Sequence, residues 1–220
     1  MKYNTDDNNE LLNQAMDDSD ALIKEYKGNG IDSILMNLSI LSNQNSRETH
    51  TGTSSSLSHP SPVAGKSIYL AGGWFSEKQV EMLTIVSHLL GKNPTVGNTH
   101  IPLLNQYKTM NEDMGTPEGY EWANETFNAD VTAMNLADIG VFLWDKEEPD
   151  SGTAMELGYM YANHKPIVLV GPKEYDLDYK KNKLNLMIAK GLTVYVDSYK
   201  DLLEFDFNEI MPDPYKGKVI

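Results

Sequence analysis

Two carboxylates in the segment DSGTAMELGYMYANHKP, residues 150–166, are the first candidates for chemistry. Asp150 comes six residues before Glu156, and the residues around Glu156 are mostly apolar, so a charge sits on an otherwise apolar helix. Ser151 or Thr153 can cap this helix, which places Glu156 in its first turn, near the positive end of the helix dipole. The dipole would keep Glu156 ionised even when partly desolvated. A dry, oriented carboxylate can act as a nucleophile or stabilise an oxocarbenium ion.

Two further side chains can reach the same place. Asp130 belongs to the helical segment ETFNADVTAMNLAD, just before an apolar strand, and can reach the crevice where the carboxylates lie. Tyr69 alternates with apolar neighbours on a predicted strand and can point its hydroxyl toward the carboxylates. These residues and Glu156 also have simpler interpretations. Asp130 can be a solvated helix residue, Tyr69 can be a core tyrosine, and the charge of Glu156 can simply complement the helix dipole. The apolar surroundings of Glu156 favour function.

The loop AGGWF, residues 71–75, is the third candidate. Gly72 and Gly73 allow positive φ and a close backbone approach to a ligand, although their spacing is not that of a dinucleotide fingerprint. Trp74 and Phe75 can stack on a nucleobase or simply pack at the start of the next helix. The five histidines show no metal-ligand spacing, and no serine lies in a nucleophile elbow, so we expect no metal, no cofactor and no Ser-His-Asp triad.

Alternating strands and helices must position these loops. From Lys66 onward, helical patterns at about 76–90, 117–137, 153–163 and 184–189 separate the apolar runs KSIYLA, THIPLL, IGVFLW, PIVLV and LTVYV. This alternation predicts an α/β fold, a flavodoxin-like doubly wound sheet of about five mostly parallel strands. Ligands bind such sheets at the carboxyl ends of the strands, beside the point where strand order reverses. The loops AGGWF, WDKEEPDSGTAME and GPKEY lie at those ends.

Composition limits the classes of partner. A chain of 220 residues can hold one sizeable α/β domain plus an appendage. Its formal charge of -14 repels a phosphate backbone and an anionic membrane surface, so we expect neither nucleic-acid nor membrane binding. Cysteine is absent, and no signal peptide or apolar run of about 18 residues is apparent, which suits a cytoplasmic protein.

The first 65 residues differ from the rest. Residues 43–65 are almost all Ser, Thr, Asn, His, Pro and Gly, and we interpret them as a flexible linker. Before them, residues 1–42 could form a small helical hairpin or oligomerisation arm, or remain a partly disordered tail. Residues 66–220 are the predicted catalytic domain.

Five segments together resemble a known family. IYLAGGWFSEKQ, IPLLNQYK, WANETFNADVTAMNLADIGVFLWD, PDSGTAMELGYMYANHKPIVLV and LNLMIAKG, in this order and spacing, are similar to the nucleoside 2-deoxyribosyltransferases. The resemblance covers nearly all of residues 66–220. It implies that Glu156 attacks the anomeric carbon of a 2-deoxynucleoside, forming a covalent deoxyribosyl-enzyme from which a second base takes the sugar. Tyr69 would orient Glu156.

The same resemblance implies roles for other matching positions. Asp130 and Asp150 would hydrogen-bond the base or sugar and help to protonate the departing base. Gln106 would contact the base, and Phe75 would form a wall of the base pocket. Gly72, Gly73 and Trp74, in the same loop as Phe75, would also belong to the substrate-binding site. Since adenine is a poor leaving group, it needs a proton donor to avoid departing as an anion. The implied partners are 2-deoxynucleosides and free nucleobases.

The resemblance also implies an assembly. Asn185 and Met187 match positions that enter the site of a neighbouring subunit, so we expect a homo-oligomer with sites shared between subunits. Family members commonly end in an aromatic residue whose carboxylate approaches the sugar, whereas this chain ends PYKGKVI. The resemblance therefore does not extend to Ile220.

Two other functions fit the same site. A deoxynucleoside or deoxynucleotide N-glycosidase would hydrolyse the bond instead of transferring the sugar. A 5'-phosphate would need strong donors, and the only arginine, Arg47, lies in the predicted linker, which favours an unphosphorylated substrate. The second alternative is a non-catalytic nucleotide-sensing module, which would still bind its ligand after loss of Glu156.

Overall fold

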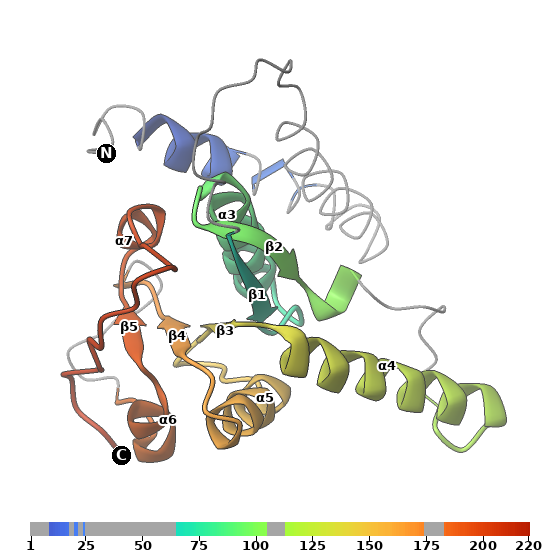
Figure 1. Ribbon diagram of the computed structural model, residues 1–220. Coiled ribbons are helices and arrows are strands. Elements are labelled where there is room, and N and C mark those ends of the chain that lie inside the picture. Colours follow the sequence, from blue (N-terminus) through green and yellow to red (C-terminus); the bar gives the residue numbers. More distant parts are fainter. Residues whose placement is uncertain (1–8, 18–19, 22–23, 25–64, 105–112, 174–182) are drawn as a thin grey trace, which may run out of the picture.

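The computed structural model describes residues 9–17, 20–21, 24, 65–104, 113–173 and 183–220. Its centre is a five-stranded parallel sheet with the strand order β2-β1-β3-β4-β5 (Figure 1). The strands are β1 (Lys66–Ala71), β2 (Val96–His100), β3 (Ile139–Leu143), β4 (Ile167–Val170) and β5 (Val194–Val196). This is the flavodoxin-like order, and it reverses between β1 and β3. The predicted fold class is confirmed.

The alternation of side chains along the strands divides the core into two layers. On β1, Ile68 and Leu70 enter one hydrophobic cluster, while Tyr69 and Ala71 enter the other. The helices follow this division on the two faces of the sheet (Figure 1). The first layer holds α3 (Glu77–Lys92) and α7 (Tyr199–Leu203), and the second holds α4 (Pro117–Leu136), α5 (Ser151–Ala162) and α6 (Leu186–Gly191).

The prediction for the second strand was wrong. THIPLL was expected to be a strand, but β2 is Val96–His100, and a 3-10 turn, η2, covers Pro102–Leu104. Proline has no N–H for a ladder hydrogen bond and a fixed φ, so Pro102 ends the strand. Gly97 and Asn98 are poor strand formers, yet a Cβ at Gly97 would lie 2.5 Å from the Gly65 oxygen, so only glycine allows this approach of two backbones.

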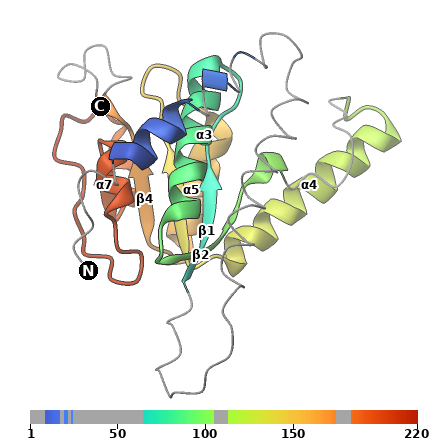
Figure 2. The ribbon, with the colours of Figure 1, turned by 90° about the horizontal axis from the view of Figure 1, so that it is seen from above.

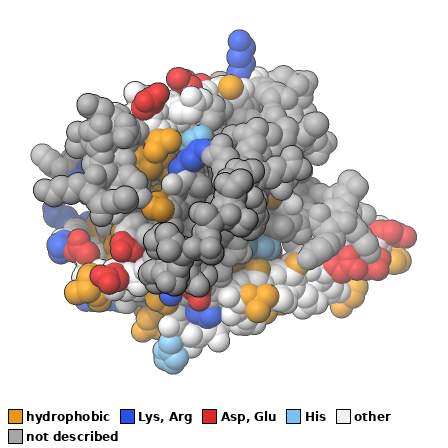
Figure 3. Space-filling model, turned by 45° about the horizontal axis from the view of Figure 1, so that its top comes forward, with side chains coloured by type: hydrophobic (Ala, Val, Ile, Leu, Met, Phe, Trp, Pro, Cys, Tyr) orange, Lys and Arg blue, Asp and Glu red, His pale blue; other side chains and the backbone are white. Residues whose placement is uncertain are grey.

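Helix α4 has little buried surface. It contains 20 residues, begins after the Thr116 cap, and buries only Gly119 and Met134 among them. Its first turns project beyond the sheet, and acidic side chains gather at the projecting end (Figures 1 and 3). Among the helices of the described ranges, none is both long and apolar enough to cross a bilayer.

Residues 9–17 form a helix that packs on the α3 and α7 side of the sheet. Ala15 is completely buried in the cluster that includes α3 and α7 side chains, and Leu11 and Leu12 pack against the same cluster. Both ribbon views place this helix beside α3 and α7 (Figures 1 and 2). The rest of the predicted extension and linker, residues 25–64, lies outside the described residues.

We predict that this helix stabilises the domain without being needed for its fold. Ala15→Asp should undock the helix, because an unpaired charge cannot be buried there, and should lower the free energy of unfolding by about 1–2 kcal/mol. The fragment 63–220 should show the same loss and should still fold. Thermal unfolding would measure a decrease of roughly 2–8 °C.

Met16→Asp is the matched control for this test. Met16 is the next residue along the helix and is 43% exposed, so the same new charge there should leave the unfolding temperature unchanged. If Ala15→Asp unfolds at the same temperature as the unsubstituted chain, the helix contributes nothing to stability. If the fragment 63–220 fails to fold, the predicted boundary at residue 66 is wrong.

Candidate active site

The centre of the site is a hydrogen bond between two elements far apart in sequence. The Tyr69 hydroxyl on β1 donates to Glu156 Oε1 on α5 at 2.6 Å. Tyr69 is fully buried, and its burial together with the neighbouring Glu156 carboxylate raises the pKa of the phenol well above its usual value, so the hydroxyl keeps its proton. The structure therefore brings together the two residues that the sequence placed at adjacent strand ends.

The charge state of Glu156 differs from the prediction. Helix α5 begins at Ser151, so Glu156 lies in its second turn rather than its first, and the dipole acts on it only weakly. Burial raises the pKa of Glu156 to about 7; the Tyr69 hydrogen bond opposes this rise, and the charges of Asp130 and Asp150 add to it. The effect of desolvation on the pKa of Glu156 thus outweighs the effect of the helix dipole, and the carboxyl is half ionised near neutral pH.

Asp150 has the capping role that the sequence analysis assigned to Ser151 or Thr153. Its Oδ2 accepts a hydrogen bond from the Thr153 amide at 2.6 Å, which defines Asp150 as the N-cap of α5. The cap ties the end of the β3–α5 loop to the helix that carries Glu156. The helix is less buried than its apolar sequence suggests, because Met155 is 61% exposed.

Asp130 and His100 lie beside the Tyr69–Glu156 pair, and His100 was not among the predicted residues. Asp130 lies on α4, and its Oδ1 is 3.8 Å from Nε2 of His100. The His100 ring stacks on Tyr69 with centroids 5.6 Å apart, because the two residues are register partners on β2 and β1. Nε2 of His100 is buried and has no hydrogen-bond partner among the described residues. Only the correct register of β2 could have indicated this histidine.

The two glycines after β1 do not have the positive φ that was expected, but both allow close approaches. Neither Gly72 nor Gly73 has a left-handed φ. A Cβ at Gly72 would lie 3.0 Å from Leu143 side-chain atoms, and one at Gly73 would lie 2.6 Å from Gln79 Oε1. The close approach is therefore to neighbouring side chains of the protein itself.

The two aromatic residues of this loop point in different directions. Trp74 packs against the hydrophobic cluster of the α3 layer, as in the packing alternative, whereas Phe75 is 68% exposed. Their rings remain in contact, with centroids 5.2 Å apart. Phe75 is thus the residue available for a ligand.

The remaining predicted residues lie elsewhere or outside the described residues. Asn185 caps α6 by accepting a hydrogen bond from the Met187 amide at 2.9 Å, and the Met187 side chain is 78% exposed. Ile220 lies beside them, since its amide donates to the Leu184 oxygen at 3.0 Å. Gln106 falls within residues 105–112, outside the described part of the chain.

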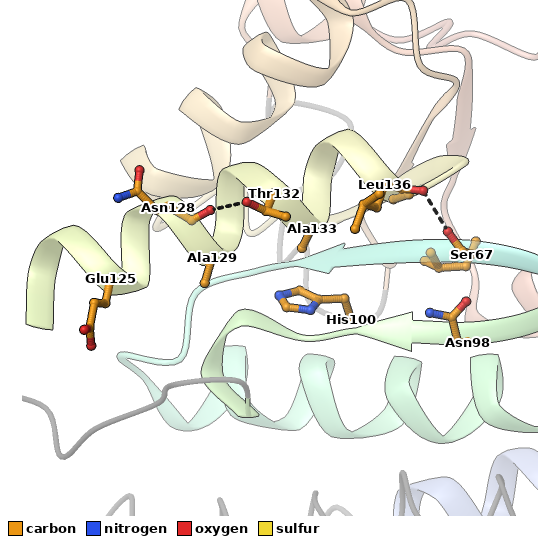
Figure 4. Close-up of a pocket in the computed structure, with 11 residues that line it drawn as sticks. Ser67, Asn98, His100, Glu125, Asn128, Ala129, Thr132, Ala133 and Leu136 are labelled. Carbon is orange, nitrogen blue, oxygen red and sulfur yellow. Dashed lines mark hydrogen bonds between the residues drawn. The ribbon is translucent and has the colours of Figure 1, made fainter.

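A cavity of about 720 Å³ opens between α4 and the β1–β2 edge, beside the carboxylates rather than over them. Figure 4 shows the His100 ring between strand β2, which carries it, and the small side chains of Ala129 and Ala133 on α4. Asn98 and Glu125 line the same hollow. Glu156, whose carboxyl is the candidate nucleophile, is not part of its wall.

Fold and site together define a doubly wound α/β protein with a carboxylate–tyrosine pair at its β1/β3 switch point. A model of the nucleoside 2-deoxyribosyltransferase family matches residues 68–187. A nucleoside deoxyribosyltransferase of Limosilactobacillus fermentum is 35% identical over 164 residues, which cover 72% of this chain and 96% of the relative. Another, from Lactobacillus leichmannii, is 35% identical over 158 residues, 70% of this chain and 98% of the relative.

A solved structure agrees with these relatives. The 2-deoxyribosyltransferase of Bacillus psychrosaccharolyticus is 28% identical and has a TM-score of 0.53, covering 68% of this chain and 98% of that chain. The chain belongs to the nucleoside 2-deoxyribosyltransferase family. It is an enzyme, and deoxyribosyl transfer is its class of reaction.

Proposed function

We propose that this enzyme moves a 2-deoxyribosyl group between nucleobases through a covalent intermediate on Glu156. In the first step a Glu156 oxygen forms a bond to the anomeric carbon, the glycosidic C–N bond breaks, and the departing base takes a proton. In the second step a nitrogen of the acceptor base attacks the same carbon, loses a proton, and releases the Glu156 carboxylate. The first base leaves before the acceptor base binds, which is a ping-pong mechanism.

The observation that carries this proposal is the partly buried Tyr69–Glu156 hydrogen bond of 2.6 Å. The phenol donates to one oxygen of the carboxylate and fixes its orientation, so the other oxygen can face the sugar. A partly desolvated carboxylate is also a better nucleophile than a fully hydrated one, because less water has to be removed before attack.

Asp130 and Asp150 are the proposed partners of the base and sugar. Both charges lie close enough to Glu156 to raise its pKa, so both flank the place where the anomeric carbon would sit. A carboxyl group next to the leaving base can supply the proton that the base needs. Phe75, exposed at the end of β1, forms the wall of the base pocket.

The proposed substrates are unphosphorylated 2-deoxynucleosides and free bases, and the proposed active form is a homo-oligomer. Leu186 is 48% exposed and Met187 is 78% exposed, and an apolar surface at the start of α6 is typical of a contact between subunits. Asn185 and Met187 would complete the site of the neighbouring copy. The absence of cysteine supports a cytoplasmic location as part of the same proposal.

The test of the proposed function is incubation with deoxyinosine or thymidine, with and without adenine, followed by chromatography. Formation of deoxyadenosine only when adenine is present supports transfer. Release of free deoxyribose at the same rate without adenine would instead identify an N-glycosidase. Binding without any turnover would leave the sensing module as the explanation.

We predict an acidic limb in the pH profile with a midpoint near pH 7. Only ionised Glu156 can attack, so kcat/KM for the donor nucleoside should rise as pH increases through the pKa of about 7. Because the Tyr69 hydrogen bond lowers that pKa, Tyr69→Phe should move the limb to higher pH. Initial rates between pH 5 and 9 provide the measurement, and a limb near pH 4.5 in the unsubstituted enzyme would contradict the desolvated site.

A further inference from the structure

Gln79, in the first turn of α3, connects the two loops that frame the site. Its side chain is buried, with 7% of the residue exposed. Oε1 accepts a hydrogen bond from the Phe75 amide at 2.8 Å, and Nε2 donates to the Glu148 carbonyl oxygen at 3.2 Å. One neutral amide thus satisfies a donor in the β1–α3 loop and an acceptor in the β3–α5 loop.

The backbone of the β1–α3 loop passes close to the Gln79 side chain. Gly73 lies so close that any Cβ there would come within 2.6 Å of Gln79 Oε1 and 2.9 Å of Nε2. A side chain at Gly73 would therefore displace the Gln79 amide from this position. Gln79, Gly73, Glu148 and Asp150 line one small cavity at the end of the sheet.

Lys78, the residue before Gln79, also connects α3 to the β3–α5 loop. Lys78 Nζ lies 2.9 Å from Asp145 Oδ1 and 3.1 Å from Glu147 Oε2, both in the β3–α5 loop. Two neighbouring side chains of α3 thus hold the same loop, one by charge and one by a neutral amide. Gln79 in addition accepts a hydrogen bond from the Phe75 amide of the β1–α3 loop.

We propose that Gln79 is a positioning residue, which sets the distance between the base wall at Phe75 and the loop that ends in the Asp150 cap. This inference rests on the proposed function, because it assigns those two loops to one substrate. Gln79 touches no reacting atom in this arrangement. Its effect is on substrate binding geometry, and the Tyr69–Glu156 pair does not depend on it.

The test compares Gln79→Met with Thr84→Val in the full-length enzyme. Methionine keeps the volume of Gln79 but removes both hydrogen bonds. Thr84 is a matched control, because it is fully buried in the same helix and its hydroxyl donates only to the Val80 carbonyl of that helix at 2.8 Å. The measurements are kcat, KM for the donor nucleoside and the pH profile.

For Gln79→Met we expect KM to rise about tenfold and kcat/KM to fall about a hundredfold, with the Glu156 pH limb unchanged. Thr84→Val should lose stability without a change in either constant. Equal kinetic constants in the two variants would overturn the proposal. If Gln79→Met does not fold, Gln79→Glu takes its place: it keeps an acceptor for Phe75, loses the donor to Glu148, and must also raise KM.

The proposed function and the proposed role of Gln79 can be disproved independently. If the unsubstituted enzyme exchanges no bases, the proposed function is wrong before any variant is compared. If it exchanges bases and both glutamine variants keep its KM, only the role of Gln79 is wrong.

Discussion

Replacing Glu156 with glutamine is expected to abolish base exchange, lowering the rate by a factor of about a thousand or more, equivalent to about 4 kcal/mol of activation free energy. The amide has nearly the same shape and can still accept from the Tyr69 hydroxyl, but it cannot form a bond to the anomeric carbon. Chromatography of the exchange reaction measures the loss. Glu209→Gln, the same chemical change at an exposed residue, should leave the rate unchanged.

The same substitution should make the protein more stable at alkaline pH. The pKa of Glu156 is raised in the folded state to about 7, so the stabilisation associated with its protonated form is complete below about pH 4.5 and is lost as pH rises through 7. An amide stays neutral throughout, so Glu156→Gln should gain about 1–3 kcal/mol at pH 8 and almost nothing at pH 4.5.

Thermal unfolding at the two pH values gives this comparison. Near-normal exchange in Glu156→Gln would exclude the covalent mechanism. A gain in stability that is equal at both pH values would contradict the desolvated carboxyl, and leave the covalent mechanism to be judged by the exchange rate alone.

Deoxyadenosine should exchange its base about a thousandfold faster than adenosine with the same acceptor base. A 2-hydroxyl withdraws electrons from the forming oxocarbenium ion, and it also has to find space and a hydrogen-bond partner beside Tyr69 and Glu156. Both effects raise the barrier, and a combined penalty of about 4 kcal/mol corresponds to that ratio.

Initial rates at equal donor concentrations measure this preference. Deoxyadenosine and adenosine carry the same leaving base, so the comparison isolates the sugar. Equal rates would exclude a deoxyribosyl-selective site and move the assignment toward a broader nucleoside hydrolase or transferase.

The fold was largely predictable because its strands are apolar on both faces. The runs IGVFLW and IVLV are buried entirely in the structure, as parallel strands between two helical layers must be. The edge strand β2 was not predictable in the same way, since VGNTH has one partner strand and is only partly buried. His100 was missed with it, because its position beside Tyr69 depends on the register of that strand.

The pairing of Tyr69 with Glu156 was predictable, but the electrostatics of the pair were not. Tyr69 and Glu156 could be paired because the ends of adjacent strands meet at one edge of a parallel sheet. Glu156 was predicted to stay ionised, but its pKa is raised to about 7, because one turn of helix separates it from the helix start and burial dominates. Gln79 carried no sequence signal, since its partners are backbone atoms of two loops.

The sparse burial of α4 has a consequence for catalytic competence. A helix that buries only Gly119 and Met134 gains little free energy from packing, so its detached conformations lie close in energy to the docked one. Asp130 lies beside His100 only while α4 is docked, so the apparent affinity for substrate is the intrinsic affinity multiplied by the docked fraction. A second copy of the enzyme that bound the docked helix would raise that population by mass action, and specific activity would then increase with enzyme concentration.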